Sequence, residues 1–223
     1  MIESKQSSAM ILGAFGDIGQ AFTSMVLNNY TDVTLVYRSK PESQIDKLNT
    51  SARLIKLNYP SDCNEFEVFL NSRDTPFDLV VNCIGVYQET SNIYSINDFS
   101  HVMESNFYIL QYLMGFLRSR FSKNAAFVNV SSIAGSFSSE HEMAYGGAKY
   151  LVDKFINVLR DHDDMKGVRV LNVRPGAVIS KITAKRENSD FLIDPEELVS
   201  LVANVLYFGK TLSVSELNIY RRK

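Results

Sequence analysis

The sequence has few of the residues that hold a metal ion or a disulfide framework. It contains two cysteines, Cys63 and Cys83, and three histidines scattered along the chain. The two cysteines do not have the spacing of a metal site, so we expect two reduced thiols in a cytoplasmic protein. His162 lies in an Asp-His-Asp-Asp run, which we interpret as the solvated end of a helix. No metal site is predicted.

Long apolar runs and a strong net charge are also missing. No apolar run approaches the length of a membrane-spanning helix, and Met1 to Ser8 is too polar for a secretion signal. The formal net charge is −2, which favours neither nucleic acid nor an anionic membrane as a partner. The chain does have 45% hydrophobic and 22% charged residues over 223 positions. This is enough for one well-buried core and short for two, so we expect a single domain over residues 1–223.

Short β-rich runs alternate with helical patterns along the chain, without repeats, low-complexity tracts or linkers. This alternation is typical of a parallel sheet with helices on both faces. Strands are predicted at Ala9–Leu12, Val33–Tyr37, Leu54–Asn58, Leu79–Asn82, Ala126–Val130, Val168–Val173 and Glu216–Tyr220. Helices are predicted at Ile18–Asn29, Pro41–Asn49, Ser61–Ser72, Ile96–Phe121, Ala144–Asp161 and Pro195–Tyr207. With right-handed crossovers these elements predict an α/β fold of the doubly wound Rossmann type, whose site lies at the carboxyl ends of the strands.

A glycine-rich turn follows the first predicted strand and opens an amphipathic stretch. Glycines permit positive φ and close backbone approach, and the free amides at the start of a helix attract an anion. The position of the turn after the first strand favours a pyrophosphate-binding loop over a plain connection. The expected binding residues are Gly13, Phe15, Gly16, Asp17, Ile18 and Gly19.

Tyr145 and Lys149 are four residues apart in Ala-Tyr-Gly-Gly-Ala-Lys, and Ser132 stands thirteen residues before the tyrosine. On a helix, positions i and i+4 share one face. An ammonium group beside a phenol is expected to lower the phenol pKa from its usual value near 10. Such a phenol can donate a proton to a developing alkoxide or accept one from an alcohol. Ser132, rather than the neighbouring Ser131, has the spacing to hold the same substrate oxygen.

A second pair with the same spacing, Tyr150 and Lys154, lies about 140° round the same helix. It has a phenylalanine, Phe137, thirteen residues upstream in place of a serine. We interpret this pair as packing and solvated surface.

Taken together, these motifs resemble the short-chain dehydrogenase/reductase family, in its short single-domain branch. The residues that carry the resemblance are Gly13 to Gly19, Asn82-Cys83-Ile84-Gly85 after the fourth strand, Asn106, Ser132, Tyr145, Lys149 and Arg174-Pro175-Gly176. The resemblance implies hydride transfer between a nicotinamide dinucleotide and a ketone, aldehyde or alcohol. It implies Tyr145 as the general acid, Lys149 on the cofactor ribose and Ser132 on the carbonyl oxygen. It also implies that Asn82, Cys83, Ile84 and Gly85 lie against the cofactor.

Two features depart from the family's usual pattern. The loop reads Gly-x-x-Gly-x-x-Gly, with Asp17 where the middle glycine usually stands, and Asn82-Cys83-Ile84-Gly85 replaces Asn-Asn-Ala-Gly. This loop spacing resembles the family's longer epimerase and dehydratase branch, which usually has a larger C-terminal domain than 223 residues allow. We therefore keep the single-domain branch and expect Asp17 to cap the helix. An epimerase or dehydratase stays open as an alternative.

The end of the second predicted strand bears on the cofactor. An acidic residue there binds the ribose hydroxyls of NAD, whereas an arginine accommodates the 2′-phosphate of NADP. The chain reads Tyr-Arg-Ser-Lys over residues 37–40. We therefore predict NADPH, with Arg38 and Ser39 on the phosphate, and NADH as the less favoured cofactor. Asn58 stands where the family often has an aspartate facing the adenine, so Asn58 and the adjoining Tyr59 are candidate adenine contacts.

The resemblance assigns two further segments. Asn106 matches the family's fourth catalytic residue, an asparagine thought to hold a water that links the lysine to solvent. Pro175, Gly176, Val178 and Ser180 match the segment that binds the nicotinamide amide, with Ser180 in place of the usual threonine.

The sequence does not identify the substrate, a small carbonyl compound or alcohol. We expect its contacts in residues 86–99, 133–143 and 181–193. A homodimer or homotetramer is expected, because the apolar helix around Leu110 and Leu113 resembles one that pairs across a two-fold axis in many family members. A different class stays open: a non-catalytic protein that binds the dinucleotide to sense it or to dock a partner, since fold does not fix function.

Overall fold

The computed structural model describes residues 7–39, 52–180, 183, 192–207 and 212–221. The strands are β1 (Ser8–Leu12), β2 (Asp32–Tyr37), β3 (Arg53–Lys56), β4 (Phe77–Asn82), β5 (Phe121–Val130), β6 (Arg169–Pro175) and β7 (Glu216–Ile219). They form a seven-stranded sheet in the order β3-β2-β1-β4-β5-β6-β7, and each pair of neighbours is parallel. The strand order reverses at β1 and β4, and such switch points are where ligands bind in this fold.

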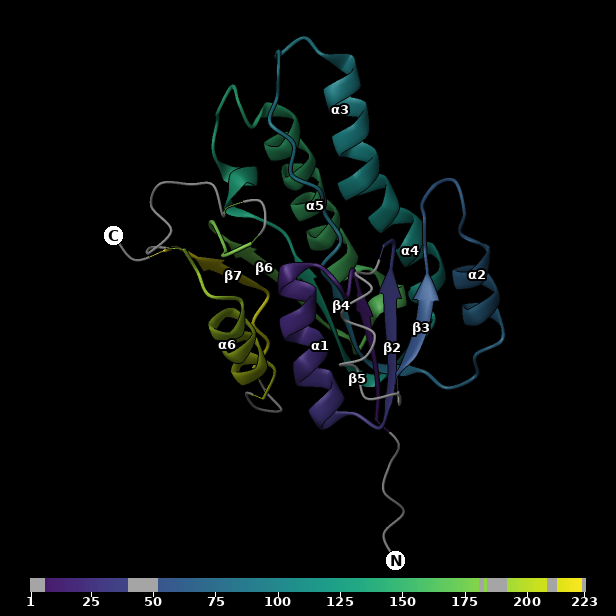
Figure 1. Ribbon diagram of the computed structural model, residues 1–223. Coiled ribbons are helices and arrows are strands. Elements are labelled where there is room, and N and C mark those ends of the chain that lie inside the picture. The colour runs from purple at the N-terminus through teal and green to yellow at the C-terminus, as the bar shows by residue number, and fades with distance from the viewer. Residues whose placement is uncertain (1–6, 40–51, 181–182, 184–191, 208–211, 222–223) are drawn as a thin grey trace, which may run out of the picture.

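Helices lie on both sides of the sheet (Figure 1). They are α1 (Asp17–Asn29), α2 (Asn64–Asn71), α3 (Ile96–Met103), α4 (Ile109–Leu117), α5 (Met143–Asp161) and α6 (Pro195–Tyr207), with a π-helical turn η2 (Glu104–Tyr108) and two 3-10 turns, η3 (Ile133–Ser136) and η4 (Asp163–Met165). The predicted doubly wound parallel fold is therefore confirmed. The helix predicted at Pro41–Asn49 lies outside the described residues.

The core has two layers because successive residues of a strand point to opposite faces. In β1, Met10 and Leu12 pack in one layer with side chains of α2, α4 and α5. Ala9 and Ile11 pack in the other layer with side chains of α1 and α6. The central strands are apolar on both faces, as expected for a parallel sheet covered by helices.

The helix predicted at Ile96–Phe121 differs from the structure in two ways. Its middle is the π-helical turn η2, which contains Asn106, and its end is at Leu117 rather than Phe121. Phe121 begins β5 because it pairs with Phe77 of β4, whose backbone N–H donates to the carbonyl of Arg120 at 2.7 Å. Pairing with the sheet therefore overrides the apolar helical pattern at this end.

The third strand is also shorter than predicted. It ends at Lys56, and Asn58 and Asp62 exchange backbone hydrogen bonds of 2.9 and 2.8 Å that close a turn. The following helix therefore begins at Asn64 rather than at Ser61. No helix in the described part of the chain is long and apolar enough to cross a membrane.

Two helix glycines give opposite predictions for stability. A Cβ built on Gly115 in α4 meets nothing within 4 Å, whereas one on Gly146 in α5 lies 3.0 Å from the carbonyl oxygen of Ala134. Gly115→Ala removes backbone freedom from the unfolded chain, so we expect the free energy of unfolding to rise by about 0.5–1 kcal/mol. Gly146→Ala is the control and should lower it. Urea unfolding measures both, and a shift of the same sign in the two variants would contradict this account.

Candidate active site

The carboxyl ends of β1, β4, β5 and β6 meet at one edge of the sheet. A cleft of about 460 Å³ opens there, and a second cavity of about 250 Å³ lies beside it. Gly16, Cys83, Ile84 and Gly85 line both. The two cavities are therefore neighbouring compartments of one site.

The glycine turn between β1 and α1 lines both cavities of the site. Gly13 has a φ of +79°, a left-handed conformation that favours glycine. A Cβ on Gly19 would lie 2.1 Å from the carbonyl oxygen of Gly13, so this helix–turn contact allows no side chain. A Cβ on Gly16 would meet the same oxygen at 3.4 Å, an ordinary contact. The fold thus requires Gly13 and Gly19, whereas Gly16 presents bare backbone to the cleft.

The role predicted for Asp17 needs correction. The N-cap of α1 is Gly16, which has no side chain to form a capping hydrogen bond. Asp17 is the first helical residue and lines the cleft. The prediction that Asp17 caps the helix is therefore wrong, although an acidic side chain in a first turn does match the helix dipole.

Ser132 and Tyr145 both line the cleft, and Ser132 is near enough to lower the pKa of the phenol. Ser132 is the N-cap of η3, and its Oγ accepts from the backbone N–H of Ala134 at 3.1 Å. That bond orients the serine oxygen. The neighbouring Ser131 is only 5% exposed, and its Oγ has no hydrogen-bond partner in the described part of the chain. The structure thus places Ser132 beside the phenol, as the spacing predicts.

Lys149 lines the cleft, and Asn106, which lines neither cavity, lies next to it. Lys149 is 4% exposed, and its Nζ lies 5.5 Å from the centroid of the Tyr145 ring. A Cβ on Gly85 would lie 2.9 Å from both Lys149 Nζ and Asn106 Oδ1, so these two polar atoms border one space that a glycine leaves open. The Asn106 amide donates to the carbonyls of Val86 and Val102, both at 2.9 Å. Its buried Oδ1 has no partner among the described residues.

Burial governs the charges of this pair. It raises the pKa of the Tyr145 phenol to about 12, against a smaller lowering from Ser132 and further raising from Glu142 and Tyr87. It lowers the pKa of the Lys149 ammonium to about 8, against an opposing effect of Asp153. The prediction that Lys149 lowers the phenol pKa is therefore wrong for this structure. The free-energy cost of burying the charged forms of the two groups is larger than the gain from their proximity.

The smaller cavity is lined by Tyr37, Arg38 and Ser39 at the end of β2, and by Tyr59. Arg38 and Ser39 are exposed, and the ring of Tyr37 meets Phe15 of the glycine turn edge-on at 5.5 Å. The basic and polar residues predicted for a 2′-phosphate therefore lie at one compartment with the predicted adenine contact Tyr59.

Two of the predicted cofactor residues line neither cavity. Asn58 turns away, and its amide donates to Ser61 Oγ at 2.8 Å. Asn82 is 3% exposed, and its Oδ1 accepts from the N–H of Ile84 at 3.2 Å. Asn82 thus fixes the backbone of the segment that follows β4 and does not itself line a cavity. Pro175, Gly176, Val178 and Ser180 all line the larger cleft.

The larger cleft is also lined by residues without a prediction of their own, among them Tyr87, Glu142, Thr183 and Arg221. The ring of Tyr87 packs edge-on against that of Tyr145, with 5.1 Å between centroids. Tyr87, Glu142 and Thr183 fall inside segments that the sequence analysis assigned to the substrate. Nothing in the sequence indicated Arg221, which follows β7 and reaches the cleft only because that strand joins the sheet beside β6.

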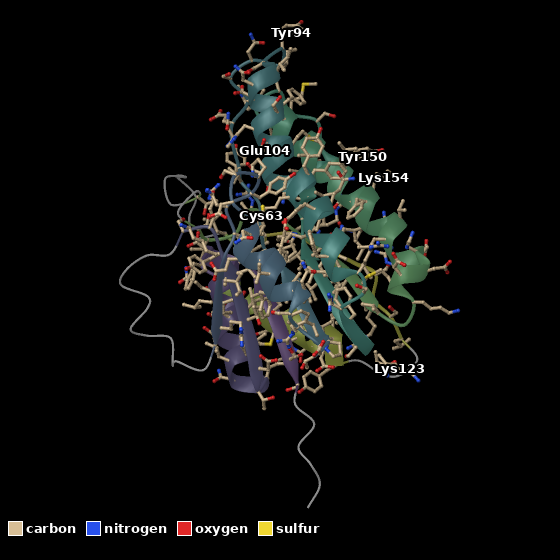
Figure 2. All side chains as sticks on the ribbon, turned by 90° about the vertical axis from the view of Figure 1, so that its right-hand side faces the viewer. Cys63, Tyr94, Glu104, Lys123, Tyr150 and Lys154 are labelled. Atoms are coloured by element: carbon tan, nitrogen blue, oxygen red, sulfur yellow. The ribbon has the colours of Figure 1, made fainter. Side chains whose placement is uncertain are left out.

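The second Tyr–Lys pair lies away from both cavities. Tyr150 is 50% exposed, and Lys154 Nζ lies 5.4 Å from its ring centroid on the outer side of α5 (Figure 2). The interpretation of this pair as surface is confirmed. Within the described ranges, no group of three or more His, Cys, Asp or Glu residues is arranged to hold a metal ion.

A nicotinamide dinucleotide fits the residues of this site. Bare backbone at Gly16 and the start of α1 suit a pyrophosphate. The compartment bordered by Arg38 suits an adenosine with a phosphate, and the buried Lys149 borders the space next to Tyr145.

Comparison with known proteins gives a consistent result. The family described as short chain dehydrogenase matches residues 7–190. An uncharacterized oxidoreductase of Staphylococcus haemolyticus is 24% identical, over 98% of this chain and 99% of that protein. Another from Staphylococcus aureus is 23% identical, over 95% of each chain.

Solved structures share the fold. Serine dehydrogenase from Escherichia coli has a TM-score of 0.77 at 21% identity, covering 95% of this chain and 96% of that one. A serine dehydrogenase complexed with NADP+ has a TM-score of 0.78 at 20% identity, covering 95% and 94%. A short-chain dehydrogenase/reductase from Brucella melitensis has a TM-score of 0.81 at 18% identity, covering 96% and 94%.

Gly19 and Gly16 of the turn should differ in how much the stability of the fold depends on them. Gly19→Ala forces a methyl group against the Gly13 carbonyl, so we expect its free energy of unfolding to fall by about 1–3 kcal/mol. Gly16→Ala is the matched control and should unfold at nearly the same denaturant concentration as the unaltered protein. Equal loss of stability in both variants would contradict the assignment of only one of them to the fold.

Proposed function

The chain belongs to the short chain dehydrogenase family of oxidoreductases, and from this premise we propose that it reduces a ketone or aldehyde to an alcohol with NADPH. One observation carries the proposal. The Ser132 hydroxyl, the Tyr145 phenol and the buried Lys149 ammonium converge in one cleft whose other wall is the glycine turn. The reaction is reversible in principle, with alcohol oxidation as the reverse direction.

The nicotinamide ring, when bound, supplies the hydride that goes to the carbonyl carbon. Ser132 donates a hydrogen bond to the carbonyl oxygen, and its position is set by the bond that its Oγ accepts from Ala134. Tyr145 then gives its proton to the oxygen as negative charge develops. A pKa of about 12 keeps this phenol protonated at neutral pH, which suits a general acid in the direction of reduction.

Lys149 has two proposed tasks. Its ammonium donates to the ribose hydroxyls of the cofactor, and it takes part in returning a proton to Tyr145 after the phenol has given up its own. The partnerless Oδ1 of Asn106 borders the same open space as Lys149 Nζ, and buried polar groups of this kind commonly bind ordered water. We assign Asn106 to the water that returns a proton from solvent through Lys149.

The choice of NADPH rests on the end of β2. Arg38 and Ser39 are exposed at the smaller cavity. A guanidinium matches the geometry of a phosphate group. Tyr59 is the proposed adenine contact, and Asn58 has no part in it because its amide binds Ser61.

The reductase proposal predicts a loss of turnover in Tyr145→Phe. A positioned acid contributes about 10²- to 10⁴-fold to the rate, so we expect a loss of that size in kcat with NADPH binding retained. NADPH consumption is measured across ketones, aldehydes and quinones, with Tyr150→Phe as the matched control because Tyr150 lies on the surface. Equal turnover in Tyr145→Phe and the control would exclude the phenol as the acid. NADPH binding without turnover of any substrate by the unaltered protein would instead favour a dinucleotide-sensing protein.

The cofactor assignment predicts a change of preference in Arg38→Asp. A lost charge-assisted bond to the phosphate costs about 1.5–3 kcal/mol, so the ratio of NADPH to NADH affinity should fall by about tenfold or more. Fluorescence titration with both cofactors measures the ratio. Lys123→Asp is the control of equal charge change, because Lys123 lies near the amino end of β5, away from the site (Figure 2). An unchanged ratio in Arg38→Asp would show that Arg38 does not contact the phosphate.

A further inference from the structure

Three asparagines of the neighbouring strands β4, β5 and β6 form a buried, hydrogen-bonded ladder. Asn82, Asn129 and Asn172 stand directly opposite one another in the strand register. Asn82 Nδ2 donates to Asn129 Oδ1 at 2.8 Å, and Asn129 Nδ2 donates to Asn172 Oδ1 at 2.9 Å. None of the three lines the cleft. The ladder therefore needs a role other than contact with a ligand.

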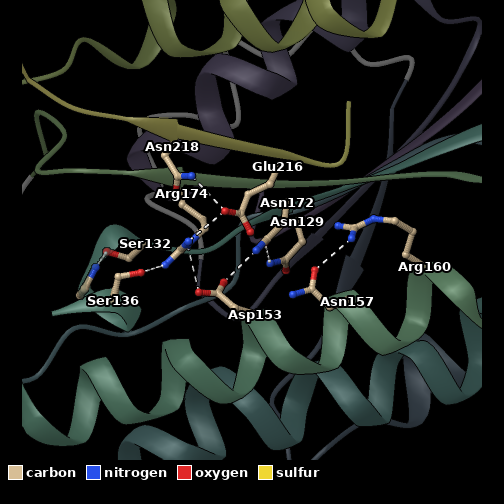
Figure 3. Close-up of polar contacts among 11 residues, drawn as sticks. Asn129, Ser132, Ser136, Asp153, Asn157, Arg160, Asn172, Arg174, Glu216 and Asn218 are labelled. Atoms are coloured by element: carbon tan, nitrogen blue, oxygen red, sulfur yellow. Dashed lines mark hydrogen bonds and ion pairs between the residues drawn. The ribbon is translucent and has the colours of Figure 1, made fainter. Parts of the chain in front are cut away.

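The ladder ends on the helix that carries Tyr145 and Lys149. Asn172 Nδ2 donates to Asp153 Oδ1 at 2.8 Å, and Asp153 lies one helical turn after Lys149 on α5 (Figure 3). The second oxygen of Asp153 lies 3.1 Å from Nε of Arg174, in an ion pair that is not a well-aligned hydrogen bond. The two side chains are 11% and 12% exposed. Residues of the sheet thus hold this buried carboxylate in place on one side of α5.

Arg174 ties further parts of the site to this carboxylate. Its Nη1 contacts Glu216 of β7 at 3.0 Å, and its Nη2 donates to Ser136 of η3, the turn that Ser132 begins (Figure 3). Pro175, which lines the cleft, is the next residue in the chain. A Cβ on Gly135 would lie 2.9 Å from Asp153 Oδ2, so η3 packs directly on the carboxylate.

Lys149 needs a counter-charge because it is buried. The groups that face it are Cys83 after β4, the neutral amide of Asn106 in η2, and Tyr145 and Asp153 on its own helix. Burial raises the pKa of the Cys83 thiol, so that group stays uncharged at neutral pH. Asp153 is the carboxylate among these four. It favours the charged form of Lys149, against the opposing effect of burial.

We propose that Asp153 is a positioning residue of the active site: anchored to the sheet by Asn172 and Arg174, it keeps Lys149 in its ammonium form one helical turn away. The charge of Asp153 is shared between Arg174 and Lys149. Without Asp153, Lys149 would lose its proton at a lower pH. Without Arg174, more of the carboxylate's field would act on Lys149, which would keep its proton to a higher pH.

The inference rests on the proposed function for its catalytic meaning, but its test does not need turnover. NMR of the protein labelled at lysine Cε and Nζ follows the titration of each side chain, and the Lys149 signal is identified by its loss in Lys149→Arg. We expect a midpoint near pH 8 in the unaltered protein. In Asp153→Asn, which keeps an acceptor for Asn172, the midpoint should fall by about one pH unit. In Glu216→Gln, the matched loss of the other carboxylate on Arg174, it should stay within a few tenths of a unit.

A second pair of variants keeps the test valid if Asp153→Asn does not fold. Arg174→Gln should raise the Lys149 midpoint, and adding Asp153→Asn to it should bring the midpoint down again by about one unit. A midpoint that does not move when Asp153 is neutralised, in either background, would overturn the proposal.

The consequence for activity is a separate readout. The basic limb of the pH profile of kcat/KM should move to lower pH in Asp153→Asn, by the same shift as the NMR midpoint. If the NMR shift occurs and no NADPH-dependent turnover is found, the proposed function fails while the link between Asp153 and Lys149 stands. If turnover is found and neither quantity shifts, the proposed function stands and the role of Asp153 fails.

Discussion

The register of the four central strands is the constraint on which the site depends. Leu12 pairs with Asn82, Asn82 with Asn129, and Asn129 with Asn172, so β1, β4 and β5 end at nearly one level while β6 continues to Pro175. Each amide of the ladder donates to the next, and a slip of one residue would turn a whole strand's side chains to the other face. Because the ladder continues into α5, the same bonds that hold the register also hold the helix that carries Tyr145 and Lys149.

Exclusion of water is the second constraint, and it shifts the pKa values of Tyr145 and Lys149 in opposite directions. Burial raises the pKa of the Tyr145 phenol to about 12 and lowers that of the Lys149 ammonium to about 8. Both changes favour the uncharged forms, because neither group can be solvated as an ion. Hydrogen bonding from Ser132 and the field of Asp153 oppose them. The balance leaves a phenol that holds its proton until charge develops on a substrate oxygen.

Much of the fold was predictable because its signals are local. Apolar runs with helical patterns between them indicate a covered parallel sheet, and the glycine turn after β1 is read from its spacing. The predictions failed where a specific contact decided the outcome, with a distant partner at Phe121 and with near neighbours at Asn58 and Asp17. Phe121 leaves the helical pattern to pair with Phe77, and Asn58 is taken by Ser61 and Asp62 in a turn. Asp17 follows the N-cap Gly16 and so cannot be the cap.

For the site, the chemical types and their order could be predicted from the chain alone: a glycine turn and an arginine after the second strand, then a serine, and then a tyrosine and a lysine one turn apart. Local spacing suffices for this, because a helix places i and i+4 on one face. The environment of those groups depends on the folded chain and could not be predicted in this way. Burial reverses the phenol pKa shift expected from Lys149 alone, and Arg174 and Asp153 meet although 21 positions separate them. Desolvation and long-range charge depend on everything packed around a residue, and no short pattern in the chain records that.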